Sequence, residues 1–183
     1  MTTALWLLAI QGVIGAFDTV YYHEWRARLP ARRAAAAPEL KLHAARDALY
    51  AVLFGSLPFV AWRGAWAIVL AAVIAAEIAL TLWDFIVEIR VRKPFGDVYG
   101  GERVTHAVMG ILYGAMVANL VPAVWQWWHL PTGLAFAPPS APEALRWTLA
   151  AMGSGVLLSG ARDLYAALGL PNFEALQVQT HLG

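Results

Sequence analysis

Five long apolar stretches constrain this chain more than any other feature of its sequence. A helix that crosses a bilayer needs roughly 20 mostly apolar residues, and five segments meet that length. The chain is 60% hydrophobic and 14% charged, whereas soluble domains are about 45–50% apolar and about 25% charged. The sequence therefore predicts an all-α, polytopic integral membrane protein, with about five transmembrane helices in a single membrane domain, residues 1–183. The predicted spans are residues 4–26, 39–62, 64–90, 102–128 and 142–168.

Charge and cysteine content exclude several functional classes. The formal net charge is +1 and there is no cysteine. Because a chain so close to neutral has no overall field to attract nucleic acid, we expect no nucleic-acid partner. Disulfides, thiolate metal ligands and cysteine nucleophiles are excluded. We expect no cleaved signal peptide, because no basic segment precedes the apolar run from Ala4, which leads into Asp18. The sequence is compatible with an oligomer.

Basic residues are concentrated in two of the four predicted connections. The first and third connections carry most of the lysines and arginines, whereas the second has only Arg63 and the fourth only Arg146. Positive charge marks the cytoplasmic side. The sequence therefore predicts an external N-terminus and a cytoplasmic C-terminus, in what we expect to be the bacterial inner membrane. Five tryptophans lie near the predicted outer interface, where aromatic belts form: Trp62, Trp66, Trp125, Trp127 and Trp128.

An internal repeat relates the second and fourth predicted spans. At an offset of 63 residues, Glu39 matches Glu102 and His43 matches His106. Tyrosine and tryptophan residues that follow them match as well: Tyr50 with Tyr113, and Trp62 with Trp125. A unit of two spans predicts a parallel repeat, with an axis along the membrane normal. We expect repeat one at about 4–62 and repeat two at about 64–128 to form a four-helix bundle, with the helix at about 142–168 added outside it.

Acids and histidines gather toward the predicted cytoplasmic ends of the spans. Residues four apart share one helix face, so Glu39 pairs with His43 and Glu102 pairs with His106. The first and third spans bring further acids to the same depth: Asp18, Glu24, Asp84 and Glu88. An acid at the centre of a membrane helix costs roughly 2.5–3.5 kcal/mol or more. Arginines, shared protons or metal cations must therefore compensate these groups.

Glu and His ligands contributed by facing helices resemble the ferritin-like di-iron carboxylate proteins, a group whose membrane-associated members, the alternative oxidases, act on a quinol. In that group one Glu from each of two helices joins a Glu-x-x-His pair from each of the other two. The resemblance implies two iron or manganese ions bound by Glu24, Glu39, His43, Glu88, Glu102 and His106. Asp18 and Asp84 are rival choices for the single carboxylates, and with Tyr22 they are candidate catalytic side chains around the metals. The spacing here is Glu-x-x-x-His, which changes the ligand angles.

The resulting hypothesis is a membrane-embedded di-metal oxidoreductase, of the oxidase, hydroxylase or desaturase kind, acting on a lipophilic substrate near the cytoplasmic face. One alternative is a metal-free acid–base isomerase or cyclase, whose carboxylates protonate a lipid. A second is a b-type haem electron carrier, with haem b bound by His43 and His106. A third is a small transporter or a structural subunit. Glu77, the deepest charge, suits either a protonated structural acid or a proton relay. The basic loop at residues 90–101 is a candidate lid.

Overall fold

The computed structural model describes residues 1–170, which are mostly helical. The long helices of this part of the chain are α1 (Thr2–Asp18), continued by the π-helical segment η1 (Thr19–Arg26), then α3 (Ala37–Ser56), α4 (Ala65–Arg92), α5 (Gly100–Trp128) and α6 (Glu143–Ala167). The short elements are α2 (Leu29–Arg32), η2 (Arg33–Ala35), η3 (Lys93–Phe95) and the strands β1 (Val60–Arg63) and β2 (Gly133–Phe136). The prediction of an all-helical protein is therefore confirmed apart from one small sheet.

Within residues 1–170, three helical segments are long and apolar enough to cross a membrane: Thr2–Arg26, Ala65–Phe95 and Gly100–Trp128. Large apolar side chains cover their outer surfaces, including Leu82 on α4 and Ile111 on α5, which are 58% and 73% exposed. Exposed apolar surface of this extent is typical of helices that face lipid. The predicted second and fifth spans correspond to α3 and α6, which are helical but do not meet the same criterion. Their crossing of the membrane stays a prediction.

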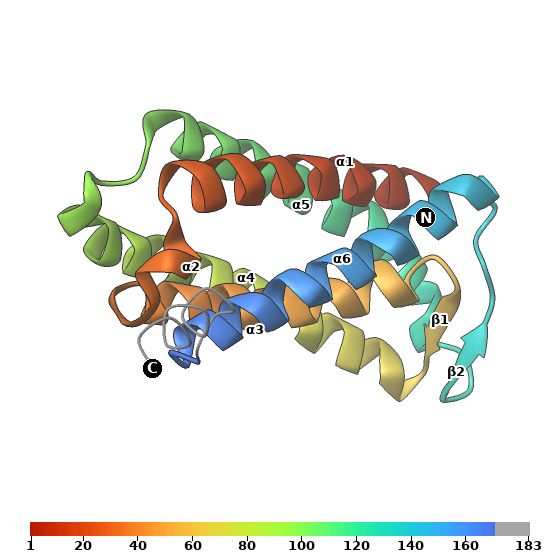
Figure 1. The fold of residues 1–183 in the computed structure, drawn as a ribbon. Helices are drawn as coiled ribbons and strands as arrows, with labels where there is room; N and C mark the ends of the chain where they lie inside the picture. Colours follow the sequence, from red (N-terminus) through yellow and green to blue (C-terminus); the bar gives the residue numbers. More distant parts are fainter. Residues whose placement is uncertain (171–183) are drawn as a thin grey trace, which may run out of the picture.

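The long helices form a closed ring (Figure 1). Each helix contacts the next in the order α1, α5, α4, α3, α6, and α6 contacts α1. The helix at 142–168 was expected outside a four-helix bundle, but α6 lies along α3 and helps to close the ring. The arrangement of two tandem repeats stays a prediction.

Two glycines allow α6 to lie directly against α3. A Cβ on Gly160 would be 2.7 Å from Cβ of Asp47, and a Cβ on Gly153 would be 3.1 Å from Cβ of Phe54. Small residues at such contacts are typical of helix pairs packed in membranes, where backbones approach closely. The close approach brings Asp163, on the same side of α6, next to His43 of α3.

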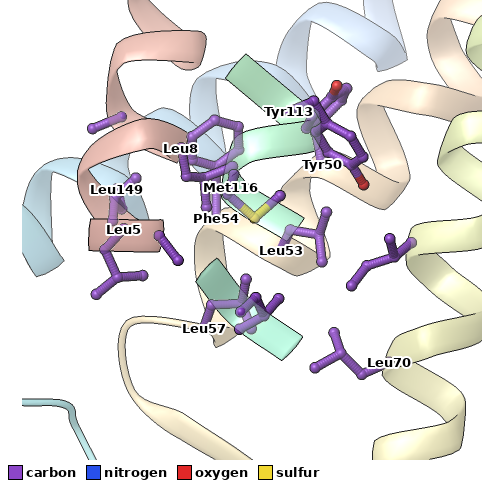
Figure 2. Packing of buried hydrophobic residues seen from close by; sticks show 14 of the residues in the cluster. Leu5, Leu8, Tyr50, Leu53, Phe54, Leu57, Leu70, Tyr113, Met116 and Leu149 are labelled. Atoms are coloured by element: carbon purple, nitrogen blue, oxygen red, sulfur yellow. The ribbon is translucent and has the colours of Figure 1, made fainter. Parts of the chain in front are cut away.

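Apolar and ionisable side chains occupy opposite halves of the interior of the ring. Figure 2 shows the apolar core, in which leucines of α1, α3, α4 and α6 pack around Met116 of α5. Its residues on α1, α3 and α6 come from the first half of α1, the end of α3 and the start of α6. The core therefore lies toward the end of the ring that carries the N-terminus and the two strands (Figure 1). There β1 pairs antiparallel with β2, with Val60 opposite Phe136 and Arg63 opposite Gly133. β2 thus gives regular structure to part of the connection between the fourth and fifth predicted spans. The opposite half of the interior holds the ionisable groups.

Candidate metal centre

Ionisable side chains from all the long helices meet at the end of the ring opposite the strands. They come from η1 and the end of α1, the start of α3, the end of α4, the start of α5 and the end of α6. This polar cluster consists of Asp18, His23, Glu39, His43, Arg46, Asp84, Glu88, Arg92, Glu102, His106 and Asp163. Most of its members are buried. Imidazole nitrogen and carboxylate oxygen are donors that iron, manganese and zinc accept, so the cluster contains side chains that could hold a metal ion.

The first subsite is formed by Asp18, His23 and His106. Nε2 of His23 and Nε2 of His106 lie 3.3 Å and 3.1 Å from the same atom, Oδ2 of Asp18. The three ligand atoms lie within 4.8 Å of one another, close enough to share one metal ion. Oε1 of Glu102 lies 3.3 Å from Nε2 of His23, and Oε2 of Glu88 lies 3.7 Å from Nδ1 of His106. Both acids can therefore complete this subsite or orient its histidines.

A π-helical turn brings His23 into the first subsite. Residues 19–26 form a π-helix that directly continues α1 after Asp18. The backbone N–H of Ala27 donates to the carbonyl oxygen of Tyr22 at 2.8 Å, the i to i+5 bond of this helix type. Each π turn holds about one residue more than an α turn, so residues five apart face the same side. Asp18 and His23 can therefore meet, which regular α-helix would prevent.

A second group of acids, termed the second subsite, surrounds His43; among the described residues, only the first subsite brings three such ligand atoms within 4.8 Å of one another. Nε2 of His43 lies 3.4 Å from Oδ2 of Asp84 and 3.9 Å from Oε1 of Glu39, while Nδ1 lies 3.4 Å from Oδ2 of Asp163. Nη1 of Arg46 also donates to Oδ2 of Asp84, at 2.7 Å. Among the described residues, Oδ1 of Asp84 is buried without a hydrogen-bond partner. That oxygen is available to a cation.

Two contacts join the subsites into one centre. The imidazole rings of His23 and His43 stack with their centroids 4.7 Å apart and their planes at 9°. Arg92, which is 1% exposed, donates from Nε to Glu39 at 2.9 Å and from Nη2 to Glu102 at 2.9 Å. The matching glutamates of the predicted repeat are therefore held by one guanidinium.

The structure brings together most of the residues predicted for the site. The predicted ligands that lie in the polar cluster are Glu39, His43, Glu88, Glu102 and His106, and the rival carboxylates Asp18 and Asp84 lie there as well. Glu24, predicted as a single carboxylate ligand, lies outside the polar cluster and forms an ion pair with Arg162 of α6. Tyr22 was a candidate catalytic side chain, but its hydroxyl lies against Gly101 and its ring stacks on Tyr99.

Four members of the polar cluster were absent from the predicted set: His23, Arg46, Arg92 and Asp163. His23 depends on the π-helical turn, which the spacing of apolar residues does not reveal. Arg46 and Arg92 were counted among the basic residues of the first and third connections, and Asp163 lies on the helix that was expected outside the bundle. A sequence signal did exist for His23, since it is one of only five histidines and follows Asp18 by five residues.

The loop between α4 and α5 is anchored to the polar cluster. The backbone N–H of Tyr99 donates to Oε2 of Glu102 at 3.4 Å. Asp97, at φ 70°, accepts a hydrogen bond from the backbone N–H of Val98 at 2.7 Å and another from Arg103 at 3.0 Å. The Val98 N–H, aided by the Arg103 guanidinium, holds the pKa of Asp97 below its usual range. The loop therefore has a defined turn beside the cluster.

Comparisons of the chain with protein-family models, with curated proteins and with solved structures give no match.

Proposed function

We propose that the polar cluster binds two metal ions, iron or manganese, in its two subsites. The observation that carries this proposal is the convergence of Asp18, His23 and His106, whose ligand atoms lie within 4.8 Å of one another. The histidine of the second subsite stacks on a histidine of the first, at 4.7 Å between ring centroids. Two neighbouring sites with carboxylate and imidazole donors suit a di-metal centre.

The charge balance of the interior also supports bound cations. Seven carboxylates are buried in the described part of the chain, and Arg46 and Arg92 are the arginines that pair with them inside the ring. The carboxylates are Asp18, Glu39, Glu77, Asp84, Glu88, Glu102 and Asp163. Two arginines offset two of the seven negative charges, and two divalent ions would offset four of the remaining five. Because uncompensated charge is costly inside a membrane protein, metal binding stabilises this arrangement.

The chemistry that follows is the oxidation of a lipophilic substrate. Iron or manganese pairs supply electron transfer and activation of dioxygen, the oxidant of this proposal. The cluster lies near one end of three helices that are apolar enough to span a membrane, so a substrate dissolved in the bilayer can approach it from the side. The chain's own groups orient the imidazoles, since Glu88 and Asp163 face the Nδ1 atoms of His106 and His43.

Topology is part of the proposal. The basic residues around the polar cluster favour placing that end of the ring at the cytoplasmic face, by the positive-inside rule. The N-terminus, which lies at the end of the ring that carries the strands, away from the end of α6 (Figure 1), would then be external. We propose the bacterial inner membrane as the location.

A metal-free acid–base enzyme is the second candidate. The observation that favours it is that Arg46 and Arg92 already pair with Asp84, Glu39 and Glu102, so part of the negative charge is compensated without metal. A haem carrier is less well supported, because acids surround each histidine and His23 stacks on His43 at the place where a porphyrin ring would have to lie.

Metal analysis of the intact protein tests the proposal. The protein is purified in mild detergent without a His-tag or chelator, and its metal content and absorption spectrum are measured. We expect about two iron or manganese ions per chain and no Soret band. The double variant His43→Ala/His106→Ala should lose this metal. Full metal retention in that variant would contradict the proposal, and a metal-free wild-type protein would favour the acid–base enzyme.

A further inference from the structure

A second group of polar side chains lies deeper in the ring than the polar cluster. This deep polar group consists of Gln11, Tyr50, Glu77, Thr81 and Tyr113. Gln11 and Glu77 are 2% and 1% exposed. Nε2 of Gln11 donates to the Tyr50 hydroxyl at 2.7 Å, and the Thr81 hydroxyl donates to Oε1 of Glu77 at 2.7 Å.

Two atoms of the deep polar group lack partners. Among the described residues, the Tyr113 hydroxyl and Oε1 of Gln11 are buried and make no hydrogen bond. Unpaired buried polar atoms cost free energy, so they call for an explanation. One is a donor and the other an acceptor, and the hydroxyl group of a ligand can satisfy both because it accepts and donates at the same oxygen.

The deep polar group borders the apolar core on one side and is joined to the polar cluster on the other. Toward the strands it meets the apolar core, where Tyr50 and Tyr113 border Leu53 and Met116 (Figure 2). On the other side Arg46 lies between Glu77, at 3.8 Å from its Nε, and Asp84 of the polar cluster, at 2.7 Å from its Nη1. Because these polar side chains end at the apolar core, they do not form a continuous path for ions across a membrane. The deep polar group is instead a closed extension of the polar cluster.

An apolar groove runs along the outside of α4 and α5, and its lining includes helical neighbours of Glu77 and Tyr113 but no member of the deep polar group. Its volume is about 570 Å³, and Ala71, Ile74, Val117 and Trp125 are among its lining residues. Ile74 precedes Glu77 by three residues on α4, and Val117 follows Tyr113 by one helical turn on α5. The α4 residues along the groove, 67–78, span roughly 16 Å, a length suited to an alkyl chain.

We propose that this groove and the deep polar group together bind a lipid alcohol, a molecule with a long hydrocarbon chain and a hydroxyl head. The chain lies in the groove between α4 and α5. The head accepts a hydrogen bond from Tyr113 and donates one to Gln11 or Glu77. The role of the lipid alcohol as the substrate rests on the proposed oxidoreductase. Its binding to the groove does not require the metal.

Photolabelling tests the binding. The intact protein in detergent is labelled with a hexadecanol that carries a diazirine in its chain, and unlabelled hexadecanol, its methyl ether and hexadecane compete. We expect labelled peptides from α4 and α5. We expect hexadecanol to compete up to roughly tenfold better than the ether, which lacks the donor, and better still than hexadecane.

Three variants sharpen this test. Tyr113→Phe should weaken the competition by hexadecanol several-fold, up to roughly tenfold. Ala71→Trp should fill the groove and abolish labelling of α4 and α5. Leu158→Trp is the matched control, because Leu158 is 71% exposed on α6 and lies outside the groove; it should label like the wild type. Equal competition by all three compounds, unchanged in Tyr113→Phe, would overturn the proposal and leave a groove filled by bulk lipid.

Metal analysis of the same samples separates the two proposals. Metal without selectivity for the alcohol overturns the lipid-alcohol site and leaves the di-metal centre standing. Selectivity for the alcohol without metal upholds the site and contradicts the di-metal oxidoreductase.

Discussion

Nε2 of His23 lies 3.3 Å from Oδ2 of Asp18 although the two residues are five positions apart on continuous helix. The π-helical segment that begins at Thr19 makes this contact geometrically accessible. π-helical turns are rare and are found frequently at functional sites, because they cost backbone stability without improving packing. Here the turn gives the first subsite its second imidazole.

Replacement of His23 tests the role of the π-helical turn. His23→Ala removes one of three converging ligands, so we expect the metal content to fall from about two ions per chain to about one. His129→Ala is the control, because His129 is exposed at the opposite end of α5, where its ring contacts the carbonyl oxygen of Trp125. Metal analysis of both variants, after size-exclusion chromatography to confirm folding, provides the measurement. Equal metal content in the two variants would remove His23 from the site.

A second pair of variants decides which carboxylate of the first helix is a ligand. Asp18→Asn keeps the shape of the side chain but removes the charge that faces His23 and His106, so we expect loss of metal from the first subsite. Glu24→Gln should keep the metal, because Glu24 faces Arg162. Both are measured by metal analysis. Loss of metal in Glu24→Gln alone would restore Glu24 as the ligand and would mean that its ion pair with Arg162 opens.

Local sequence patterns predicted the helices and most of the side chains that meet in the polar cluster. Apolar runs identified all the long helices of residues 1–170, and the spacing of Glu39 with His43 and of Glu102 with His106 placed both pairs on inward faces. These predictions succeed because helical periodicity is a local property of the chain.

Long-range contacts could not be predicted in the same way. The place of α6 in the ring depends on the fit of Gly153 and Gly160 against α3, and glycines in an apolar helix do not identify their partner helix. The contact between Asp163 and His43 was therefore not predicted from the sequence. The two strands were missed because they pair residues that lie far apart in the sequence, Val60 with Phe136, and are very short.

The contact between α3 and α6 can be tested at Gly160. Gly160→Ala would place a Cβ 2.7 Å from Cβ of Asp47, so the helices must separate. We expect a loss of about 1–3 kcal/mol in the free energy of unfolding, together with weaker metal binding because Asp163 moves away from His43. Gly155→Ala is the matched control on the same helix, because a Cβ there meets no atom within 4 Å. It should be neutral or slightly stabilising, since alanine favours helix over glycine. Unfolding in detergent, followed by circular dichroism, compares the two, and equal stability would show that the helices are not in close contact.

Removal of Arg92 tests whether one guanidinium holds the two matching glutamates. Arg92→Met leaves Glu39 and Glu102 buried without their shared partner, and breaking a buried ion pair from one side typically costs about 3–5 kcal/mol. The triple variant Arg92→Met/Glu39→Gln/Glu102→Gln removes the uncompensated charge and should recover much of that loss, although it should bind less metal. Arg103→Ala is the control, because its ion pair with Asp97 is exposed and pairs of this kind contribute about 0–1 kcal/mol. The midpoint of thermal unfolding is measured for all three. If Arg92→Met is as stable as Arg103→Ala, the glutamates are compensated by another cation, and the metal content of Arg92→Met then shows whether that cation is the bound metal.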